Sequence, residues 1–499
     1  MLWRNSLWNL SGSALPAIAA LATVPLLISA LGVEGFGIVT LIGSVIGYFG
    51  VLDVNLSAGA IKYLAESHAA GNQRRFAETF WFGALFYGGL GIIGGLAIFF
   101  SASWLLDTFF KVSAELHEDT VLALKIGAAG FAITQIQNYL ITVPQSLQRY
   151  DRSAQSEAFF GIMVNIASVL AAMAGGGVAG VIGIRILLSL VNVGWLIWLI
   201  RLLGLDLRFC WPGAEVRRGM THFSAYAYLS KLASTLHQHG DKLIIGALAG
   251  PVALAFYTVP ATLASRVLGF TYRLGSVIYP RASALAATNR MDELRPLYLG
   301  AMRHITYINL VALGMIVLAG QEFLRRWVGE EFVESGYPVL VLMTIALLVD
   351  SLTNIPSLVN DALGHPRVTG RFALARAALG LSLVYVGCLV SGIVGATLGH
   401  LVATLLLGVS FLCFVHGRTV PVSLLETVRE GWGRSVLIGL GAFALAWPAT
   451  MFLPSGIAGT AAAMLIGLAL LGLAYIVFVA SMDERSAMLS MARRLVSQG

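Results

Sequence analysis

Charged side chains within apolar segments are the residues of this sequence most able to do chemistry. Residues 230–279 form two apolar segments around a turn at 250–251, and their charges include Lys231, Asp241, Arg266 and Arg273. A charge at the centre of a membrane helix costs about 2.5 to 3.5 kcal/mol on insertion scales, and such residues usually mark substrate or ion paths. The alternative interpretation is that neighbouring side chains satisfy these charges without any role in transport.

Arg266 and Arg273 have the side chain best suited to holding a phosphate group. The planar guanidinium donates two parallel hydrogen bonds to phosphate oxygens. Along a helix Arg266 would lie about 22 Å from the turn at 251, near the middle of a bilayer, and Arg273 about 10 Å further on the same face. We predict that Arg266, Lys231 and Arg273 bind an anionic headgroup. For Arg273, and for the fourth candidate Arg185, snorkelling to the interface is the alternative.

Polar side chains at helical spacing form a second signal. One stripe is Asp350, Thr353, Asn354, Ser357 and Asp361, and a shorter one is Gln135, Asn138 and Gln145. They could line a cleft, where Asp350 or Asp241 would bind a coupling ion, H⁺ or Na⁺, and the amides would bind sugar hydroxyls. The alternative is hydrogen bonding between membrane helices, and for Asp241 an ion pair with Lys242.

The balance of charges within the apolar segments separates two classes of cargo. These segments hold seven cations (Lys125, Arg185, Lys231, Lys242, Arg266, Arg273 and Arg376) and four acids (Asp53, Asp241, Asp350 and Asp361). An exporter of cationic drugs needs an acidic pocket, whereas an anionic lipid headgroup needs a basic one. The surplus of cations favours an anionic cargo. We expect Lys125 to snorkel and Arg376 to lie at the interface.

The composition is that of an all-α polytopic membrane protein. Of 499 residues 58% are hydrophobic and 11% charged, with a mean hydropathy of +0.82, whereas soluble proteins contain about 25% charged residues. A span needs about 20 apolar residues. We predict fourteen transmembrane helices, at 6–30, 36–56, 80–106, 120–143, 156–174, 178–203, 221–249, 251–279, 299–324, 337–360, 371–392, 394–416, 434–452 and 457–481.

The distribution of basic residues predicts the orientation. If the N-terminus is inside, 22 of the 32 Lys and Arg fall on the cytoplasmic side and 3 on the outer side, so the positive-inside rule places both termini in the cytoplasm. The net charge of +7 therefore reports topology and not nucleic-acid binding. Cys210, Cys388 and Cys413 lack the paired spacing of a disulfide framework or a zinc site. The predicted outer connections are too short to hold an enzyme's active site.

The second half of the chain repeats landmarks of the first. Residues 31–40 match 249–258 at an offset of 218, residues 178–180 match 393–395 at 215, and the loops with Asn72 and Asn289 correspond. Six helices per repeat give both halves the same orientation, as in parallel-repeat transporters. We predict an N-terminal lobe at 1–210, a C-terminal lobe at 211–420, and helices 13 and 14 with a cytoplasmic tail at 421–499.

Several short motifs then carry a family resemblance over about residues 1–420. They are Asn9 and Pro16, Leu31-Gly32 with Phe36-Gly37, Leu52-Asp53, Ala65-Glu66, and Asp241 before Gly250 and Tyr257. With them the chain resembles the polysaccharide transporter branch, the O-antigen or Wzx-type flippases, of the multidrug/oligosaccharidyl-lipid/polysaccharide flippase superfamily, which includes the MATE transporters. The chain departs from the family pattern at Gly37, which the internal repeat aligns with Ala255. It also lacks the N-terminal Arg-Asp pair expected of lipid II flippases.

The resemblance implies two helical bundles around a cationic cavity and a cargo of polyprenyl-diphosphate-linked oligosaccharide. We therefore expect a flippase of the bacterial inner membrane, not an enzyme, that moves this glycan lipid to the outer leaflet by alternating access. Membrane lipid and, for surface polysaccharide, a polymerase and glycosyltransferases would be its partners, with no nucleic acid and no metal or other cofactor besides the coupling ion. The alternative is a cation-coupled multidrug antiporter of the same fold.

Overall fold

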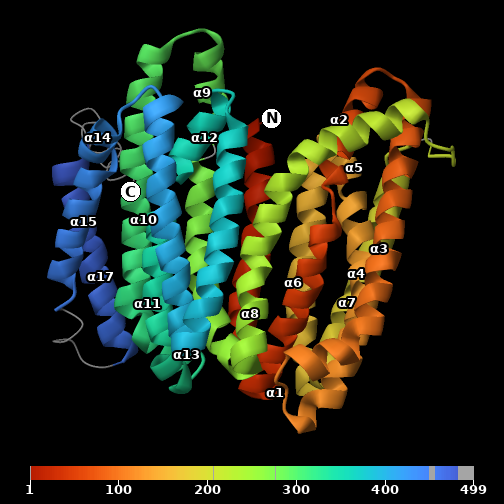
Figure 1. Ribbon diagram of the computed structural model, residues 1–499, viewed down its shortest axis with the longest axis horizontal. Helices are drawn as coiled ribbons and strands as arrows, with labels where there is room; N and C mark the ends of the chain where they lie inside the picture. The colour runs from red at the N-terminus through yellow and green to blue at the C-terminus, as the bar shows by residue number, and fades with distance from the viewer. Residues whose placement is uncertain (1, 206, 276, 449–455, 481–499) are drawn as a thin grey trace, which may run out of the picture. The chain divides into compact units, whose positions relative to one another are not determined.

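The computed structural model describes residues 2–205, 207–275, 277–448 and 456–480, with the backbone alone for residues 2–14, 223, 225–227, 229, 230, 267, 270, 273, 274 and 457. These residues form helices and turns, with no β-strand among them (Figure 1). The chain divides into two compact units, described separately. Unit 1 comprises residues 1–258 with 388–396, and unit 2 comprises residues 259–387 with 397–499.

The helices begin and end at the following residues. Up to the middle of the chain they are α1 (Leu2–Tyr48), η1 (Phe49–Leu52), α2 (Leu56–Ala69), α3 (Gln73–Phe109), α4 (Ala114–Leu140), α5 (Thr142–Ser146), α6 (Tyr150–Met173), α7 (Gly177–Leu202) and α8 (Ala214–Gly275). After it they are α9 (Ile278–Ala287), α10 (Met291–Trp327), α11 (Glu331–Ser351), α12 (Asn354–Ala362), α13 (Pro366–Arg418), α14 (Leu424–Glu426), η2 (Thr427–Trp432), α15 (Gly433–Ala446), α17 (Ile457–Ala474) and η3 (Tyr475–Val479).

Ten helical segments among the described residues are long and apolar enough to cross a membrane. Three of the ten, within α1, α8 and α13, join two helices across an interior kink. A membrane protein of many spans is thereby confirmed. Each predicted span falls at least partly on a described helix, but the count of fourteen stays a prediction, because it depends on how the kinked helices are divided.

Glycine in the left-handed region forms two of these kinks. Gly32 has φ 72° and ψ 170°, and Gly250 has φ 85° and ψ 175°. A side chain with a Cβ atom rarely adopts this conformation, so the sequence marks both kinks by residue type. The two glycines have nearly the same dihedral angles, and they are the pair that the sequence match at offset 218 aligns.

Three further pairs of left-handed residues have almost the same spacing, whereas Asn55, Gly175, Gly204, Gly329 and Gly456 have no such counterpart among the described residues. Gly71 and Asn289 are 218 residues apart, Gln148 and Gly364 are 216 apart, and Gly177 and Gly392 are 215 apart, all with positive φ. Together with Gly32 and Gly250, four turns of the first half thus have counterparts in the second. Local backbone geometry and sequence landmarks therefore give the same offset.

Helices of unit 1 approach one another closely where small residues meet. Gly91 and Gly95 on α3 lie against the backbone of Ala132 and Ala128 on α4, so that a Cβ on either glycine would fall 2.9 Å from an α4 atom. Small residues four apart allow such close packing between membrane helices, where dispersion forces replace the hydrophobic effect. A cluster around Tyr87, Tyr139 and Leu64 completes this core.

The first part of α8 packs against α1 and α2 within unit 1. Gly59 of α2 faces Ser224 and the Met220 carbonyl, and Gly37 of α1 faces the Pro251 carbonyl. Contacts therefore group residues 214–258 with the first half of the chain, whereas the sequence places them in a lobe at 211–420. The predicted boundaries at 210 and 420 stay predictions.

In unit 2, α10 is the helix on which its neighbours pack. α11, α15 and α17 contact it (Figure 1), and the Tyr307 hydroxyl of α10 donates a hydrogen bond of 2.6 Å to the Leu471 carbonyl of α17. The Tyr475 hydroxyl also lies 2.9 Å from His304 Nδ1. The residues of the two predicted C-terminal helices are thus docked on α10 by polar and apolar contacts.

Candidate transport site

The two best-placed predicted cations, Lys231 and Arg266, are both exposed side chains of α8. Neither forms an ion pair with any described residue. They lie in different units, Lys231 in unit 1 and Arg266 in unit 2. Both positive charges therefore remain uncompensated within their own units, as a binding site for an anion requires. The side chain of Arg273 lies outside the described residues.

Arg185 is held at the contact between two helices of unit 1. Its Nε donates a hydrogen bond of 2.9 Å to the Ser168 hydroxyl of α6, and that hydroxyl donates one of 2.6 Å to the Val164 carbonyl. Ser168 is fully buried. Part of the Arg185 guanidinium is thus engaged in packing α6 against α7, and its predicted phosphate role stays a prediction.

Asp241 binds a tyrosine of its own helix. The Tyr257 hydroxyl donates a hydrogen bond of 2.6 Å to Asp241 Oδ2, and the Lys242 backbone N–H donates one of 2.8 Å to Oδ1. The Lys242 ammonium group instead donates to the Gln238 carbonyl. The carboxylate of Asp241 is therefore satisfied by groups on either side of the kink at Gly250, and no ion pair with Lys242 is found among the described contacts.

Asp350 forms an ion pair that the sequence did not reveal. Its Oδ1 accepts a hydrogen bond from the Arg376 guanidinium of α13, and each side chain is about one quarter exposed. Arg376 therefore pairs with a carboxylate of the polar stripe, although we expected it at the interface. The pair removes one cation and one acid from the charge balance and leaves the positive surplus unchanged.

The amides of the two polar stripes differ in their surroundings. Asn354 is 7% exposed, and neither polar atom of its side chain has a partner among the described residues. Gln135 is 5% exposed, with an unpaired Nε2. Asn138 is exposed. Burying an amide without a hydrogen-bond partner costs about 1 to 3 kcal/mol of stability in mutational data. A water molecule or a polar ligand would therefore be stabilising beside Asn354 and Gln135.

A buried network around Asp53 was not predicted from the sequence. The Tyr87 hydroxyl donates to Asp53 Oδ1 at 2.9 Å and accepts from the Ser57 backbone N–H at 2.9 Å. Tyr87 stacks on Tyr139, with ring centroids 5.4 Å apart. Because Asp53 is 8% exposed and its Oδ1 also accepts from the Asn55 backbone N–H at the turn before α2, we interpret it as a residue that stabilises the fold of unit 1.

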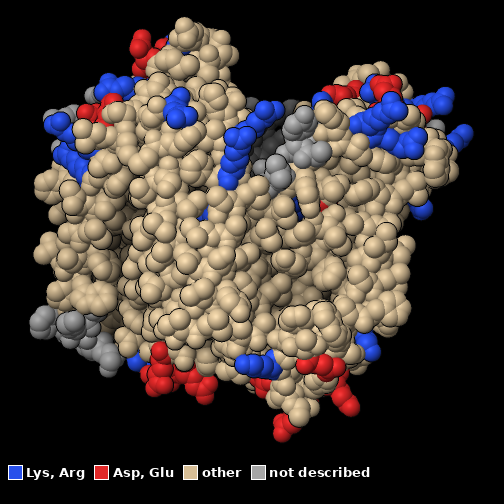
Figure 2. Space-filling model, in the orientation of Figure 1, with Lys and Arg blue, Asp and Glu red and all other residues tan. Residues whose placement is uncertain are grey.

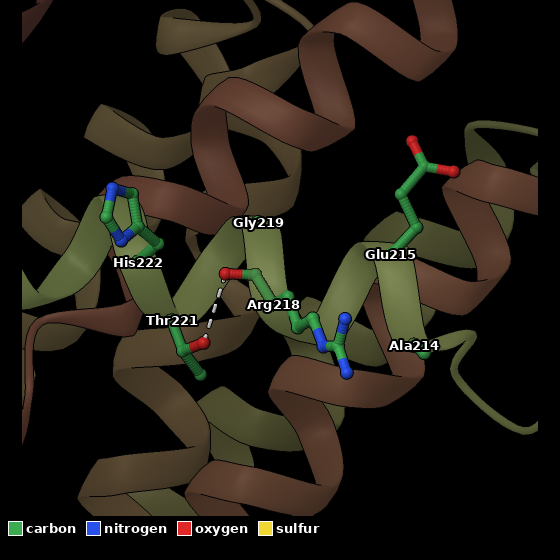
Figure 3. Close-up of a pocket in the computed structure, with 6 residues that line it drawn as sticks. All are labelled: Ala214, Glu215, Arg218, Gly219, Thr221 and His222. Atoms are coloured by element: carbon green, nitrogen blue, oxygen red, sulfur yellow. Dashed lines mark hydrogen bonds between the residues drawn. The ribbon is translucent and has the colours of Figure 1, made fainter.

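An open cavity of about 900 Å³ lies along the start of α8. Within unit 1 it is lined by Ala214, Glu215, Arg218, Gly219, Thr221 and His222 (Figure 3). Glu215 pairs with Arg75 at 3.2 Å, whereas Arg218 forms no ion pair with a described residue. Sequence reasoning did not single out Arg218, because nothing in a single helical turn indicates a concave surface.

The surface separates charged ends from an uncharged band. On the face shown in Figure 2, charged side chains gather at the two ends of each unit, and few interrupt the band between them. Such a band is typical of a surface that faces lipid. Within the part of the chain that the structure describes, no cluster of His, Cys, Asp and Glu could hold a metal ion.

Fold and surface together define the class: a helical, multi-pass membrane protein. Solved structures support this class through their folds. The inward closed conformation of the lipid II flippase MurJ has a TM-score of 0.74 at 12% identity, over 95% of this chain and 98% of that one. An inward-facing MATE family multidrug resistance transporter of the MOP superfamily has a TM-score of 0.71 at 14% identity, over 84% and 99%.

Sequence comparison assigns the family. The model of the family described as "Polysaccharide biosynthesis protein" matches residues 28–336. The chain is also 24% identical over 413 residues to the Shigella flexneri protein named "Putative O-antigen transporter", covering 81% of this chain and 95% of the relative. This protein belongs to that polysaccharide biosynthesis family, and it is similar to the O-antigen transporter over most of its length. The resemblance predicted from the sequence is confirmed.

Proposed function

We propose that this protein moves a polyprenyl-diphosphate-linked oligosaccharide from the cytoplasmic to the outer leaflet of the bacterial inner membrane. The oligosaccharide would be exported for a cell-surface polysaccharide, namely O-antigen, capsule or exopolysaccharide. The observation that carries the proposal is the pair of uncompensated cations, Lys231 and Arg266, on a helix apolar enough to span a membrane. Charges so expensive in lipid are stabilised when they face a wet path or an anion. A diphosphate supplies that anion, and Arg273 would extend the site by two helical turns.

The family assignment narrows the cargo. A relative named as an O-antigen transporter covers most of this chain, and the solved structure with a TM-score of 0.74 is a lipid II flippase. The first name concerns the transport of O-antigen, and the second concerns the flipping of a lipid. The cation surplus of the apolar segments supports the same class of cargo, because the headgroup of such a lipid is anionic.

The proposed topology has fourteen spans with both termini in the cytoplasm. It divides the chain into two six-helix lobes related by a parallel repeat, which rock in alternating access. The four left-handed positions that recur 215 to 218 residues later support the repeat. Glycosyltransferases would build the glycan before this step, and a polysaccharide polymerase would act on it afterwards.

Complementation of a deletion strain tests the proposal. Without the protein, lipid-linked oligosaccharide should accumulate in the cytoplasmic leaflet, and Arg266→Ala should fail to relieve that accumulation. Lys125→Ala is the matched control, because Lys125 is also a cation of an apolar helix but lies over the Phe99 ring, 5.8 Å from its centroid. Both variants must insert at wild-type levels. Export that continues normally with Arg266→Ala would refute the phosphate site.

The alternative, a cation-coupled multidrug antiporter, rests on the MATE fold alone. It predicts that the deletion strain becomes sensitive to drugs while its surface glycan stays normal. The positive surplus within the apolar segments argues against a cationic cargo. Asp350 is paired with Arg376, and Asp241 and Asp361 each accept a hydrogen bond from a hydroxyl group, so these three acids already have partners.

A further inference from the structure

The connector between α7 and α8 presents aromatic side chains to its surroundings. It lies at the same end of unit 1 as α2 (Figure 1), which is the cytoplasmic end in the proposed topology. Leu205 and Leu207 pack against the core of unit 1, whereas Phe209 and Trp211 are 60% and 70% exposed. The ring centroid of Phe209 lies 5.1 Å from that of Trp81 and 6.5 Å from that of Trp211. Exposed aromatic rings at the end of membrane helices are typical of the layer where lipid headgroups meet acyl chains.

Two hydrogen bonds hold this connector on α3. The Trp81 indole N–H donates to the Leu207 carbonyl at 3.0 Å, and the Gly213 backbone N–H donates to Glu78 Oε2 at 3.2 Å. The other oxygen of Glu78 accepts from Arg74 Nε at 3.1 Å. The exposed rings therefore stand on a backbone that α3 positions just before the start of α8. A surface that is ordered in advance loses less conformational entropy when it binds a partner.

The open cavity of about 900 Å³ follows directly, along the first turns of α8 (Figure 3). Helix α2 approaches α8 at Gly219, where an added Cβ would overlap the Tyr63 hydroxyl. The Tyr63 ring also has two cations beside it, with its centroid 5.4 Å from Lys62 Nζ and 5.9 Å from the Arg75 guanidinium carbon. The start of α8, α2 and the start of α3 thus meet at this cavity.

Two groups at the cavity keep protons that a ligand can accept. The Thr221 hydroxyl donates to backbone carbonyls of its own helix, including that of Arg218 at 3.2 Å (Figure 3). Glu215 pairs with Arg75 at 3.2 Å. Among the described residues, no side chain pairs with Arg218 and none bonds to the Tyr63 hydroxyl. Because a guanidinium can only donate hydrogen bonds, the free donors at this cavity are suited to an anion.

The charges at the cavity select the class of anion. Glu215 neutralises Arg75, so Arg218 leaves one net positive charge among these three side chains. A phosphate monoester carries about 1.5 to 2 negative charges at neutral pH, whereas a phosphodiester carries a single one. A zwitterionic lipid cancels that charge with its own ammonium group. An anionic phospholipid matches the single charge of the cavity, and its acyl chains match the exposed rings of the connector.

We propose that the start of α8 and the connector before it form a binding site for an anionic phospholipid of the cytoplasmic leaflet. Arg218 and the Tyr63 hydroxyl donate to the phosphodiester, while Phe209 and Trp211 lie where the headgroups end. The negative surface potential of that leaflet attracts basic residues beside membrane helices. Arg217, which is exposed and has no ion pair among the described residues, adds to this attraction. The bound lipid would hold the start of α8 at the membrane surface, a role beyond the proposed transport.

Native mass spectrometry of the purified full chain tests the site without requiring transport. The protein in a neutral detergent is titrated with dioleoylphosphatidylglycerol or dioleoylphosphatidylcholine, and the dissociation constant of the first bound lipid is measured. The wild type should bind phosphatidylglycerol more tightly. Arg218→Gln should weaken this binding by about fivefold, the ratio expected for one basic residue at an anionic membrane surface, and leave phosphatidylcholine binding unchanged. Arg218→Lys keeps the charge and should retain most of the affinity.

Two further variants separate electrostatics from damage to the fold. Glu215→Gln removes the partner of Arg75 and should strengthen phosphatidylglycerol binding by a similar factor, which a loss of structure would not do. Arg290→Gln is the matched control, because it also removes a basic residue from the side that is cytoplasmic in the proposed topology. It does so in unit 2, where Arg290 Nε donates to Glu293 at 2.7 Å, and it should leave the dissociation constant unchanged.

Fluorescence quenching locates the bound lipid. Bromine atoms on the acyl chains of phosphatidylglycerol, close to the headgroup, quench nearby tryptophans, and the difference between wild type and Trp211→Phe isolates the signal of Trp211. Quenching of Trp211 should be greater with brominated phosphatidylglycerol than with brominated phosphatidylcholine at equal mole fraction. Arg218→Gln should remove that excess. Equal quenching of Trp211 by the two lipids in the wild type would contradict a lipid held at this end of α8.

The remaining outcomes distinguish the possible sources of the anion. Equal affinity of the wild type for the two lipids, or no change in either Arg218→Gln or Glu215→Gln, would overturn the site. Displacement of phosphatidylglycerol by inorganic phosphate at equal concentration would assign the cavity to a free anion and overturn the phospholipid. Displacement by a lower concentration of a polyprenyl diphosphate would assign it to the cargo, with the same consequence. All these assays measure binding alone, so their failure would leave the proposed transport function standing.

Discussion

Gly37 offers the sharpest test of the packing that joins α8 to α1. A Cβ on Gly37 would lie 2.0 Å from the Pro251 carbonyl oxygen, and ordinary contact begins near 3.4 Å. Gly37→Ala must therefore separate the two backbones by about 1.4 Å, since a backbone carbonyl cannot move away as a side chain can. Overpacking of this kind costs about 1 to 3 kcal/mol.

Gly43 supplies the matched control on the same helix. No atom lies within 4 Å of a Cβ built at Gly43, and the residue is exposed. Gly43→Ala should stabilise the helix by about 0.5 to 1 kcal/mol, because alanine loses less backbone entropy on folding. The free energies of unfolding of the two variants should therefore differ by about 1.5 to 4 kcal/mol.

Equilibrium unfolding in mixed micelles, followed by tryptophan fluorescence, measures this difference. Gly37→Ala should unfold at lower denaturant than wild type, and Gly43→Ala at equal or higher denaturant. Equal stability of the two variants would refute the close contact between α1 and the turn at Pro251. Gly399 in unit 2, whose Cβ would lie 2.2 Å from the Leu383 carbonyl, should behave like Gly37.

Two further predictions concern unit 1. Tyr87→Phe removes the hydrogen bonds with Asp53 and with the Ser57 N–H. It should lower the free energy of unfolding by about 1.5 to 3 kcal/mol, the range for hydrogen bonds to charged groups. Tyr385→Phe, at an exposed tyrosine, should change the free energy of unfolding little, and equal effects of the two variants would contradict the network around Asp53. In the loop before α8, burial and the Glu78 carboxylate raise the pKa of the Cys210 thiol, against Arg74. The thiolate fraction of Cys210 at pH 8 is then below that of an ordinary thiol. Glu78→Gln should lower the pKa of Cys210 and speed its labelling by maleimide, followed by mass spectrometry between pH 7 and 9. An unchanged labelling rate would show that the Glu78 carboxylate has no influence.

Hydropathy and glycine placement revealed much of the fold in advance. Apolar segments predicted the membrane helices because lipid requires every backbone group to bond within its own helix. The turns expected near Gly32 and Gly250 coincide with left-handed kinks, since these positions need a residue without Cβ. The grouping of residues 214–258 with the first half could not be predicted, because it depends on contacts such as Gly37 with Pro251.

The candidate site was accessible from the sequence only in part. Lys231 and Arg266 stood out because a charge in an apolar segment is conspicuous in any single sequence. The partners of the acids were missed: Arg376 for Asp350, Tyr257 for Asp241 and Tyr87 for Asp53. These partners lie 16 to 34 residues away, on another helix or, for Tyr257, across the kink at Gly250, and helical periodicity does not extend that far.

The most direct test of the central proposal is the leaflet in which lipid-linked oligosaccharide resides when the protein is absent. An impermeant glycan-modifying probe, applied to spheroplasts of the deletion strain, separates the two leaflets. The account predicts that the accumulated lipid is protected from the probe, and becomes accessible on complementation with wild type or Lys125→Ala but not with Arg266→Ala. Accumulated lipid that is already accessible in the deletion strain would contradict the flippase.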